Sequence, residues 1–393
     1  MTQRKTGRAN VSPKARSKSP LASSLEPAFV PPYPPSWFDR LTAAVDRLPG
    51  PAWLSYMAIA ALGTSLFVAA AATGGDYRPG QLLAFHVWIA GQLAYMLALM
   101  HYLDRSAGSA LDSFRPVLED GRPAERSAKA DASTFADLRY RLTTLPPWPT
   151  WLATLAGAAF GFSLPFLFLG SWLKAADLLS VSATFAPFGL STTSLFFVRF
   201  IQVYFILTEA VAGTLVFHTV HQLRLISRVY ASQTRLNLYR LQPLYAFSVP
   251  AGLTSAGLVV YTYGWFGTAP LLLSEPIGRV LGLFFTAVAA MTFAWPLLGI
   301  HRRLVDEKKR LLAESAAKFE ATVDELHRRI DKKALTSMDD LNKTLSSLEI
   351  EQAALRRIPT WPWEPGTLRG VIAALGLPII IWLIQYGLQR LLQ

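Results

Sequence analysis

The residue type best suited to chemistry in this sequence is an acid inside an apolar stretch. Glu209 stands within segment 193–219 and, at about 100° per residue, shares one face of a helix with Arg199 and Gln202. An ionisable residue at mid-bilayer is costly and is by default a candidate functional site. This stripe could carry a proton or a cation. Because no other acid lies well inside an apolar segment, we prefer a structural role, in which Glu209 holds neighbouring helices together.

Two polar residues of segment 81–101, His86 and Gln92, are candidate partners of Glu209. Six residues separate them along the chain, which turns a helix by about 240°. The two side chains are therefore not expected to share one face.

Three histidines are predicted near the inner ends of apolar segments. His218 and His221 have the three-residue spacing that permits metal ligation on a helix, but no carboxylate or cysteine ligand accompanies them in the sequence. Structural roles are therefore favoured, and neither a metal nor another cofactor is predicted. His301 is followed by two arginines and indicates the basic end of an apolar segment.

The loop 221–242 is basic and contains no acid. Lipid phosphate or an anionic partner could bind its arginines, although ordinary retention of positive charge inside the cell explains them equally well. They are Arg224, Arg228, Arg235 and Arg240. The sequence has no glycine-rich phosphate loop, H-E-x-x-H or G-x-S-x-G motif, and no cysteine for thiol chemistry. An enzyme is accordingly the least supported class.

The composition points to a membrane protein that would position these residues on helices. Only 16% of residues are charged, 52% are hydrophobic and the mean hydropathy is +0.29. Seven apolar runs reach the roughly 20 residues that a helix needs to cross a bilayer: 52–72, 81–101, 149–170, 193–219, 245–265, 277–300 and 368–389. No removable signal peptide is indicated. The predicted fold is an all-α, polytopic membrane protein.

The net charge of +12 has a topological explanation that needs no nucleic acid. Of 38 Lys and Arg residues, 32 fall in the tail 1–48 and in segments 102–147, 221–242 and 301–358. Positive residues are retained on the cytoplasmic side of membrane spans. We therefore predict a cytoplasmic N-terminus, a C-terminus outside, and a location in the plasma (inner) membrane of a bacterium.

The chain divides into five predicted parts. These are a disordered basic tail (1–35), an amphipathic helix lying in the membrane interface (36–48), a bundle of six spans (49–300), a cytosolic segment (301–358), and a linker with the last span (359–393). The loop 102–147 could contain one short amphipathic helix, but residues 113–133 read as mostly linker. In the third span, Ala153, Gly157, Gly161 and Pro165 recur every four residues and indicate a close packing face.

Segment 301–358 has two heptad-like seams with charged residues between the apolar ones. The first contains Leu312, Ala316, Phe319, Val323, Leu326 and Ile330, and the second Met338, Leu341, Leu345, Leu348, Gln352 and Leu355. We interpret the segment as an antiparallel helical hairpin, with one long irregular helix as the alternative. Two helices alone make a marginal coil, so residues 304–357 are expected to pair with a second copy or a cytosolic protein.

The stretch IPTWPWEPG, residues 358–366, links this hairpin to the last span. Its three prolines favour an extended strut, which would compensate for a returning helix about 20 Å shorter than the outgoing one. Trp361 and Trp363 suit the interfacial belt of the membrane.

Two functions remain open from the sequence. The first is a non-enzymatic organiser or signal-relay protein that acts through its cytosolic hairpin, beyond contacts with the lipid bilayer itself. The second is a transporter or channel for a small solute or ion, built on the polar stripe around Glu209.

Overall fold

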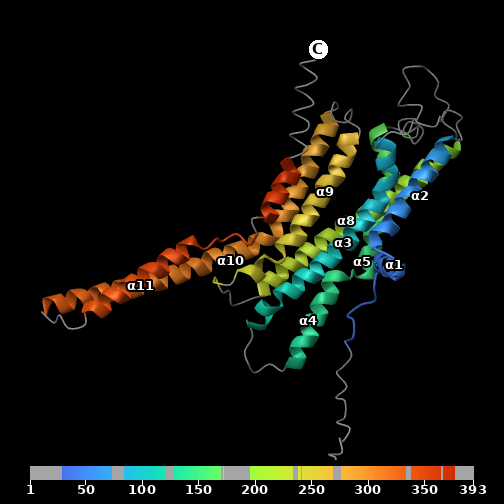
Figure 1. The fold of residues 1–393 in the computed structure, drawn as a ribbon. Helices are drawn as coiled ribbons and strands as arrows, with labels where there is room; N and C mark the ends of the chain where they lie inside the picture. Colours follow the sequence, from blue (N-terminus) through green and yellow to red (C-terminus); the bar gives the residue numbers. More distant parts are fainter. Residues whose placement is uncertain are drawn as a thin grey trace, which may run out of the picture.

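The structure is a computed structural model. It describes residues 29–72, 84–120, 128–169, 171, 195–232, 238–239, 241–268, 276–332, 338–363 and 366–376. Every regular element in these ranges is a helix (Figure 1). Most of the basic tail, the outer loop predicted after the third span, and most of the last predicted span lie outside the described residues.

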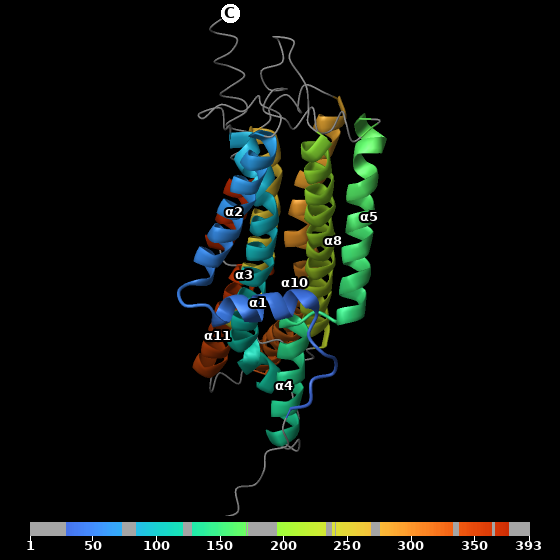
Figure 2. The same ribbon diagram turned by 90° about the vertical axis from the view of Figure 1, so that its right-hand side faces the viewer.

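A bundle of long helices forms the body of the molecule (Figures 1 and 2). Its members are α2 (Ala52–Ala72), α3 (Ala84–Asp120), α5 (Pro147–Leu169), α8 (Leu195–Ser232), α9 (Ser248–Thr268) and the first half of α10 (Pro276–Asp331). In the described part of the chain, four helical segments are long and apolar enough to cross a membrane: Ala52–Ala72, Leu195–Ala231, Gln242–Thr268 and Arg279–Asp331. The protein is therefore an all-helical chain with the features of a membrane protein.

Glycines bring α5 and α8 into backbone contact. A Cβ atom added to Gly157 would lie 2.1 Å from the carbonyl oxygen of Glu209, and one added to Gly213 would lie 2.3 Å from that of Ala153. Either substitution would force the two helices apart. The four-residue spacing of small residues in α5 predicts this packing face, and the structure confirms it at Gly157 and Gly161.

The expectation of a mostly linker-like segment at 113–133 is wrong for its described residues, 113–120 and 128–133. Helix α3 continues without a break to Asp120, and α4 (Ala128–Thr143) follows it. Together with the last turns of α8 and the short 3₁₀ helix η2 (Gln242–Tyr245), they enclose a buried aromatic cluster. In it, the ring of Phe114 lies 5.6 Å from that of Tyr230 and 5.3 Å from that of Phe247. The charged residues of α3 conceal the helical spacing of its apolar ones.

Beyond the bundle, α10 continues into a long projection with α11 (Met338–Arg357) running back alongside it (Figure 1). We call residues 301–332 and α11 the helical arm. Leu304 and Leu355 are buried at its root. There the ammonium group of Lys308 donates hydrogen bonds to the carbonyl oxygens of Arg356 (2.8 Å) and Ile358 (2.7 Å). A cation at the carboxyl end of α11 also complements the helix dipole.

The segment after α11 packs against α10 as it returns to the bundle. Trp361 stacks on His301 with ring centroids 3.8 Å apart, and Trp363 stacks on Trp361 at 4.3 Å and faces Phe293 at 5.5 Å. The ring nitrogen Nδ1 of His301 donates a hydrogen bond to the carbonyl oxygen of Thr360 (3.0 Å). Both indoles therefore contact the protein, whereas the sequence predicts that they face lipid headgroups.

Candidate functional site

Helix α1 (Trp37–Arg47) crosses one end of the bundle, which we call the α1 end (Figure 2). A capping box begins the helix. The Ser36 hydroxyl accepts from the Asp39 backbone N–H (3.3 Å), and the Asp39 carboxylate accepts from the Ser36 N–H (2.8 Å). Phe38 and Val45 are buried against the bundle. The helix is thus anchored in protein along one face, a contact that its amphipathic pattern does not specify.

Polar contacts fix α1 to the neighbouring elements. Besides capping its own helix, the Asp39 carboxylate accepts from the N–H of Leu145, which lies between α4 and α5 (3.1 Å). The indole of Trp37 donates to the Thr154 hydroxyl in α5 (2.9 Å), which in turn lies 2.8 Å from the hydroxyl of Thr214 in α8. Burial raises the pKa of Asp39 above its ordinary value, against the opposing effect of its hydrogen bonds.

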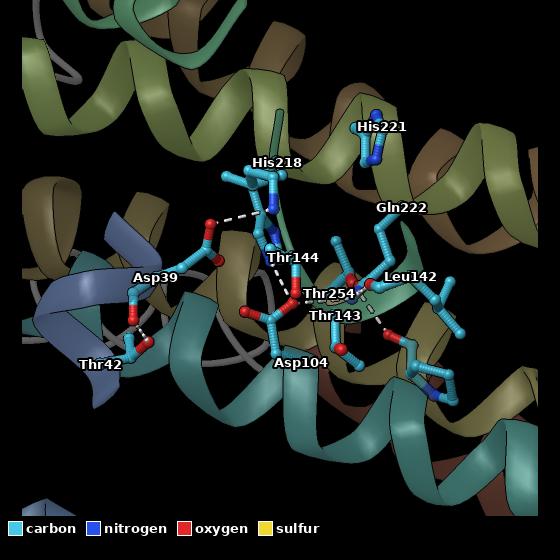
Figure 3. A network of polar contacts seen from close by, with 12 residues as sticks. Asp39, Thr42, Asp104, Leu142, Thr143, Thr144, His218, His221, Gln222 and Thr254 are labelled. Carbon is cyan, nitrogen blue, oxygen red and sulfur yellow. Dashed lines mark hydrogen bonds and ion pairs between the residues drawn. The ribbon is translucent and has the colours of Figure 1, made fainter. Parts of the chain in front are cut away.

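The central contact at the α1 end joins α3 and α8, where Asp104 and His218 lie at ion-pair distance. The Nε2 atom of His218 lies 2.8 Å from an Asp104 carboxylate oxygen, and the His218 side chain is only 1% exposed (Figure 3). Gln222 donates to the same oxygen at 3.4 Å, and the Phe38 ring stands edge-on to His218 at 6.1 Å. Burial raises the pKa of Asp104, while the nearby His218 acts in the opposite direction.

His221 extends these polar contacts toward α4, where its Nε2 atom lies 3.1 Å from the carbonyl oxygen of Arg141. Burial lowers the pKa of His221 below its ordinary value, and the positive charge of Arg228 acts in the same direction. We call Asp39, Asp104, His218, His221 and Gln222 the α1-end network (Figure 3). It joins α1, α3, α8 and the connection between α4 and α5.

The network has groups that can bind protons but no access for a substrate. With Nε2 facing the carboxylate, Nδ1 of His218 is buried and has no hydrogen bond within the described ranges. An aspartate that orients a histidine is the arrangement of a general base, yet a side chain 1% exposed cannot touch a substrate. No group of three or more potential metal ligands occurs among the described residues. The arrangement is therefore best suited to holding helices together.

The polar stripe predicted on α8 is only partly continuous. Arg199 donates to the side-chain oxygen of Gln202 (2.9 Å) in an exposed contact. Glu209 lies further along α8 at the close contact with α5, where a Cβ on Gly161 would come within 2.6 Å of the Cβ of Glu209. Its carboxylate has no hydrogen bond or ion pair with any residue that the structure describes.

His86 and Gln92 are both buried on α3. Gln92 accepts a hydrogen bond from the hydroxyl of Tyr261 in α9 (3.4 Å). His86 contacts the ring of Phe67, with centroids 5.8 Å apart. Tyr261, which sequence reasoning missed, is therefore a polar partner of Gln92.

Most seam residues of the arm are half-buried, and Leu355 at its root is fully buried. Those of intermediate exposure are Leu312, Phe319, Val323, Leu326, Met338, Leu341, Leu345, Leu348 and Gln352. One seam position on α10 differs from the prediction: Ser315 is buried near Glu351 (3.4 Å), while Ala316 is exposed. Ile330, predicted in the seam, is 49% exposed at the far end.

The sequence pattern could reveal a role for Asp39, but not the contact between Asp104 and His218. Ser36 and Asp39 have the S-x-x-D spacing of a capping box, so the first role of Asp39 could have been found. Asp104 and His218 are 114 residues apart. No local pattern links them, and only the fold brings them together.

Comparison with protein-family models finds no match, and comparisons with curated proteins and with solved structures find none either. Function is therefore inferred from the positions and contacts of the residues themselves.

Proposed function

We propose that this is a non-enzymatic, multi-pass membrane protein that organises a partner, or relays helix movement to it, through the helical arm on the cytosolic face. The observation that carries the proposal is one uninterrupted helix. Residues Pro276–Asp331 of α10 form 56 residues of continuous helix, part of it in the bundle and part in the arm. A helix without a break transmits rotation or displacement from one part to the other.

The arrangement in the membrane is part of the proposal. We infer seven spans, with α3, α5 and a last span beginning at Gly366–Gly376 added to the four segments that meet the length and hydropathy criteria. Exposed tryptophans at the α1 end support a membrane boundary there: Trp53, Trp148 and Trp151. Because positive residues concentrate beyond this boundary, the arm and the N-terminus would both be cytosolic.

Contacts at the root of the arm support a mechanical connection. Arg303 of α10 donates hydrogen bonds to the carbonyl oxygens of Tyr230 (3.2 Å) and Ala231 (2.6 Å) in the last turn of α8. The stack of Trp361 on His301 ties the returning chain to the same part of α10. A shift of α8 or α10 would therefore be felt at the base of the arm.

The surface of the arm is suited to a binding partner. Ile350 is 70% exposed and Ile330 is 49% exposed, and the seam between the helices is only half-covered. Burying a side chain of this size against a partner contributes about 1.5–3 kcal/mol. The partner would be a cytosolic protein or a second copy of this chain.

The test is capture of partners from native membranes with matched variants. Leu326→Asp and Leu345→Asp place a charge in the half-buried seam, and Ala321→Asp and Ser347→Asp place the same charge on its exposed outside. We expect the seam variants to lose captured partners that wild type and the outside variants retain. Equal capture by all forms, including a deletion of residues 304–357, would refute the proposal.

Buried polar side chains on α3, His86 and Gln92, the second of them hydrogen-bonded to Tyr261, favour a second candidate, a transporter or channel for a small solute or ion. It predicts that Glu209→Gln abolishes flux in proteoliposomes. An organiser would tolerate the same variant and keep its partner. The tight glycine contact beside Glu209 leaves little room for a pathway on that side, so the arm remains the better supported site.

A further inference from the structure

Two arginines of α8 carry exposed positive charges. Arg224 and Arg228 are exposed, and neither forms a hydrogen bond or an ion pair with any residue that the structure describes. Two acids of the neighbouring helices α4 and α3 are already engaged, since Asp137 pairs with Arg141 (2.8 Å) and Asp112 with Arg139 (2.8 Å). These positive charges are therefore available to an anionic ligand.

Their position continues an apolar stripe of the same helix. Val216 and Val220 are 65% and 40% exposed, and Arg224 and Arg228 follow at the same four-residue interval. Residues four apart lie nearly above one another on a helix. The stripe thus changes from apolar to positive within one turn, as expected where a helix leaves lipid.

The start of α5 lies beside the point on α8 where the stripe changes from apolar to positive. Arg224 is eleven residues beyond Gly213, about 20° from it around the helix, and so lies on the face that packs against α5. Helix α5 runs antiparallel to α8, with Ala153 beside Gly213, and begins at Pro147. Arg224 therefore emerges beyond the first turn of α5, whose Trp148 and Trp151 are exposed.

We propose that this surface binds an anionic phospholipid of the cytosolic leaflet. Arg224 and Arg228 would contact the phosphate through guanidinium groups, which form paired hydrogen bonds with phosphate oxygens. An acyl chain would lie along Val216 and Val220, between α8 and the indoles at the start of α5. The apolar stripe directly above the arginines selects a lipid over free phosphate, because only a lipid can occupy both parts.

The experiment uses full-length protein in nanodiscs of phosphatidylcholine with a minor fraction of phosphatidylglycerol, and counts retained lipid by native mass spectrometry. Each arginine near the surface is expected to contribute roughly fivefold to affinity, so Arg224→Gln with Arg228→Gln should weaken phosphatidylglycerol binding about thirtyfold. Arg224→Lys with Arg228→Lys keeps both charges but not the paired hydrogen bonds, so its affinity should fall between those of wild type and the glutamine variant. Lys309→Gln with Lys332→Gln, an equal loss of charge on exposed positions of the arm, should change nothing.

Wild-type protein supplies a readout that does not depend on folding of a variant. A photoactivatable phosphatidylglycerol should crosslink to residues 216–228 and to the first turns of α5, and excess inorganic phosphate should not prevent it. Crosslinks elsewhere, competition by inorganic phosphate, or an equal lipid loss in the arm control would each overturn the proposal. These outcomes are independent of whether the arm binds a partner.

Discussion

The α1 end of the bundle and the helical arm are built in opposite ways. At the α1 end of the bundle, polar groups are buried and paired, and the His218 side chain is 1% exposed in contact with Asp104. In the arm beyond its root, most apolar residues between the two helices are only half-covered, and Ile350 is 70% exposed. The difference indicates that the network makes the bundle rigid, while the arm keeps surface free for binding. Stability and interaction are thus assigned to different parts of the chain.

Removing the carboxylate of Asp104 from the network should cause the largest loss of stability. Asp104→Ala leaves His218 buried without its partner, and breaking a buried pair in this way costs about 3–5 kcal/mol. Asp112→Ala removes an exposed pairing with Arg139 on the same helix and should cost about 0–1 kcal/mol. Unfolding of the two variants in detergent, followed by circular dichroism, measures the contrast. Equal losses would mean that the network does not hold the bundle.

A charge in the arm should have a local effect. Leu326→Asp should open the far half of the arm and increase amide hydrogen exchange in α11, because few other apolar contacts hold that half together. Exchange in α3 and α8 should stay at the wild-type level. An equal increase in amide exchange within the bundle would show that arm and bundle unfold as one unit and do not have separate stabilities.

The smallest expected effect is a pH dependence from His221. Burial lowers its pKa in the folded protein below the ordinary value of 6.5, so the unfolded chain binds the proton more readily. The stability it contributes is full above pH 6.5 and is lost as the pH falls through and below that value. Asp39 and Asp104, whose pKa values are raised, contribute in the opposite sense: their stabilisation is present below the ordinary value of 3.8 and is lost as the pH rises above it.

His221→Gln should therefore reduce the fall in unfolding temperature between neutral pH and pH about 5.5. The matched variant His327→Gln, on the exposed surface of the arm, should leave that fall unchanged. Thermal unfolding of the three forms in one detergent provides the measurement. If the unfolding temperature of His221→Gln fell with pH as much as that of wild type, other groups would be responsible for the pH dependence.

Patterns within short stretches of sequence predicted the features that such stretches determine by themselves, such as apolar helices and a packing face of small residues. Apolar run length predicts four of the membrane-span candidates, and the small residues of α5 predict its contact with α8. The extension of α3 was missed because Asp104, Arg105 and Arg115 lower the hydropathy of a segment whose apolar residues still have helical spacing. In the arm, a strict heptad places Ala316 at a contact that Ser315 makes.

The candidate site depends on contacts that sequence spacing does not contain. Asp104 meets His218 across 114 residues, and Tyr261 meets Gln92 across 169. Each pairing requires that the helices first be packed at the correct depth and rotation. Residue type alone identified His218 and Glu209 as unusual, but it could not supply their neighbours.

The central claim is that α10 joins bundle and arm as one stiff element. Because the chain contains no cysteine, spin labels can be placed directly at Met291→Cys in the bundle and Ala321→Cys on the arm, both exposed positions. Pulsed electron paramagnetic resonance in nanodiscs should give one narrow distance of about 45 Å. Pro296 lies between the two labels, and a fixed proline bend would shorten this distance without broadening it. A broad distribution or several distances would reveal a hinge between bundle and arm and would contradict the account.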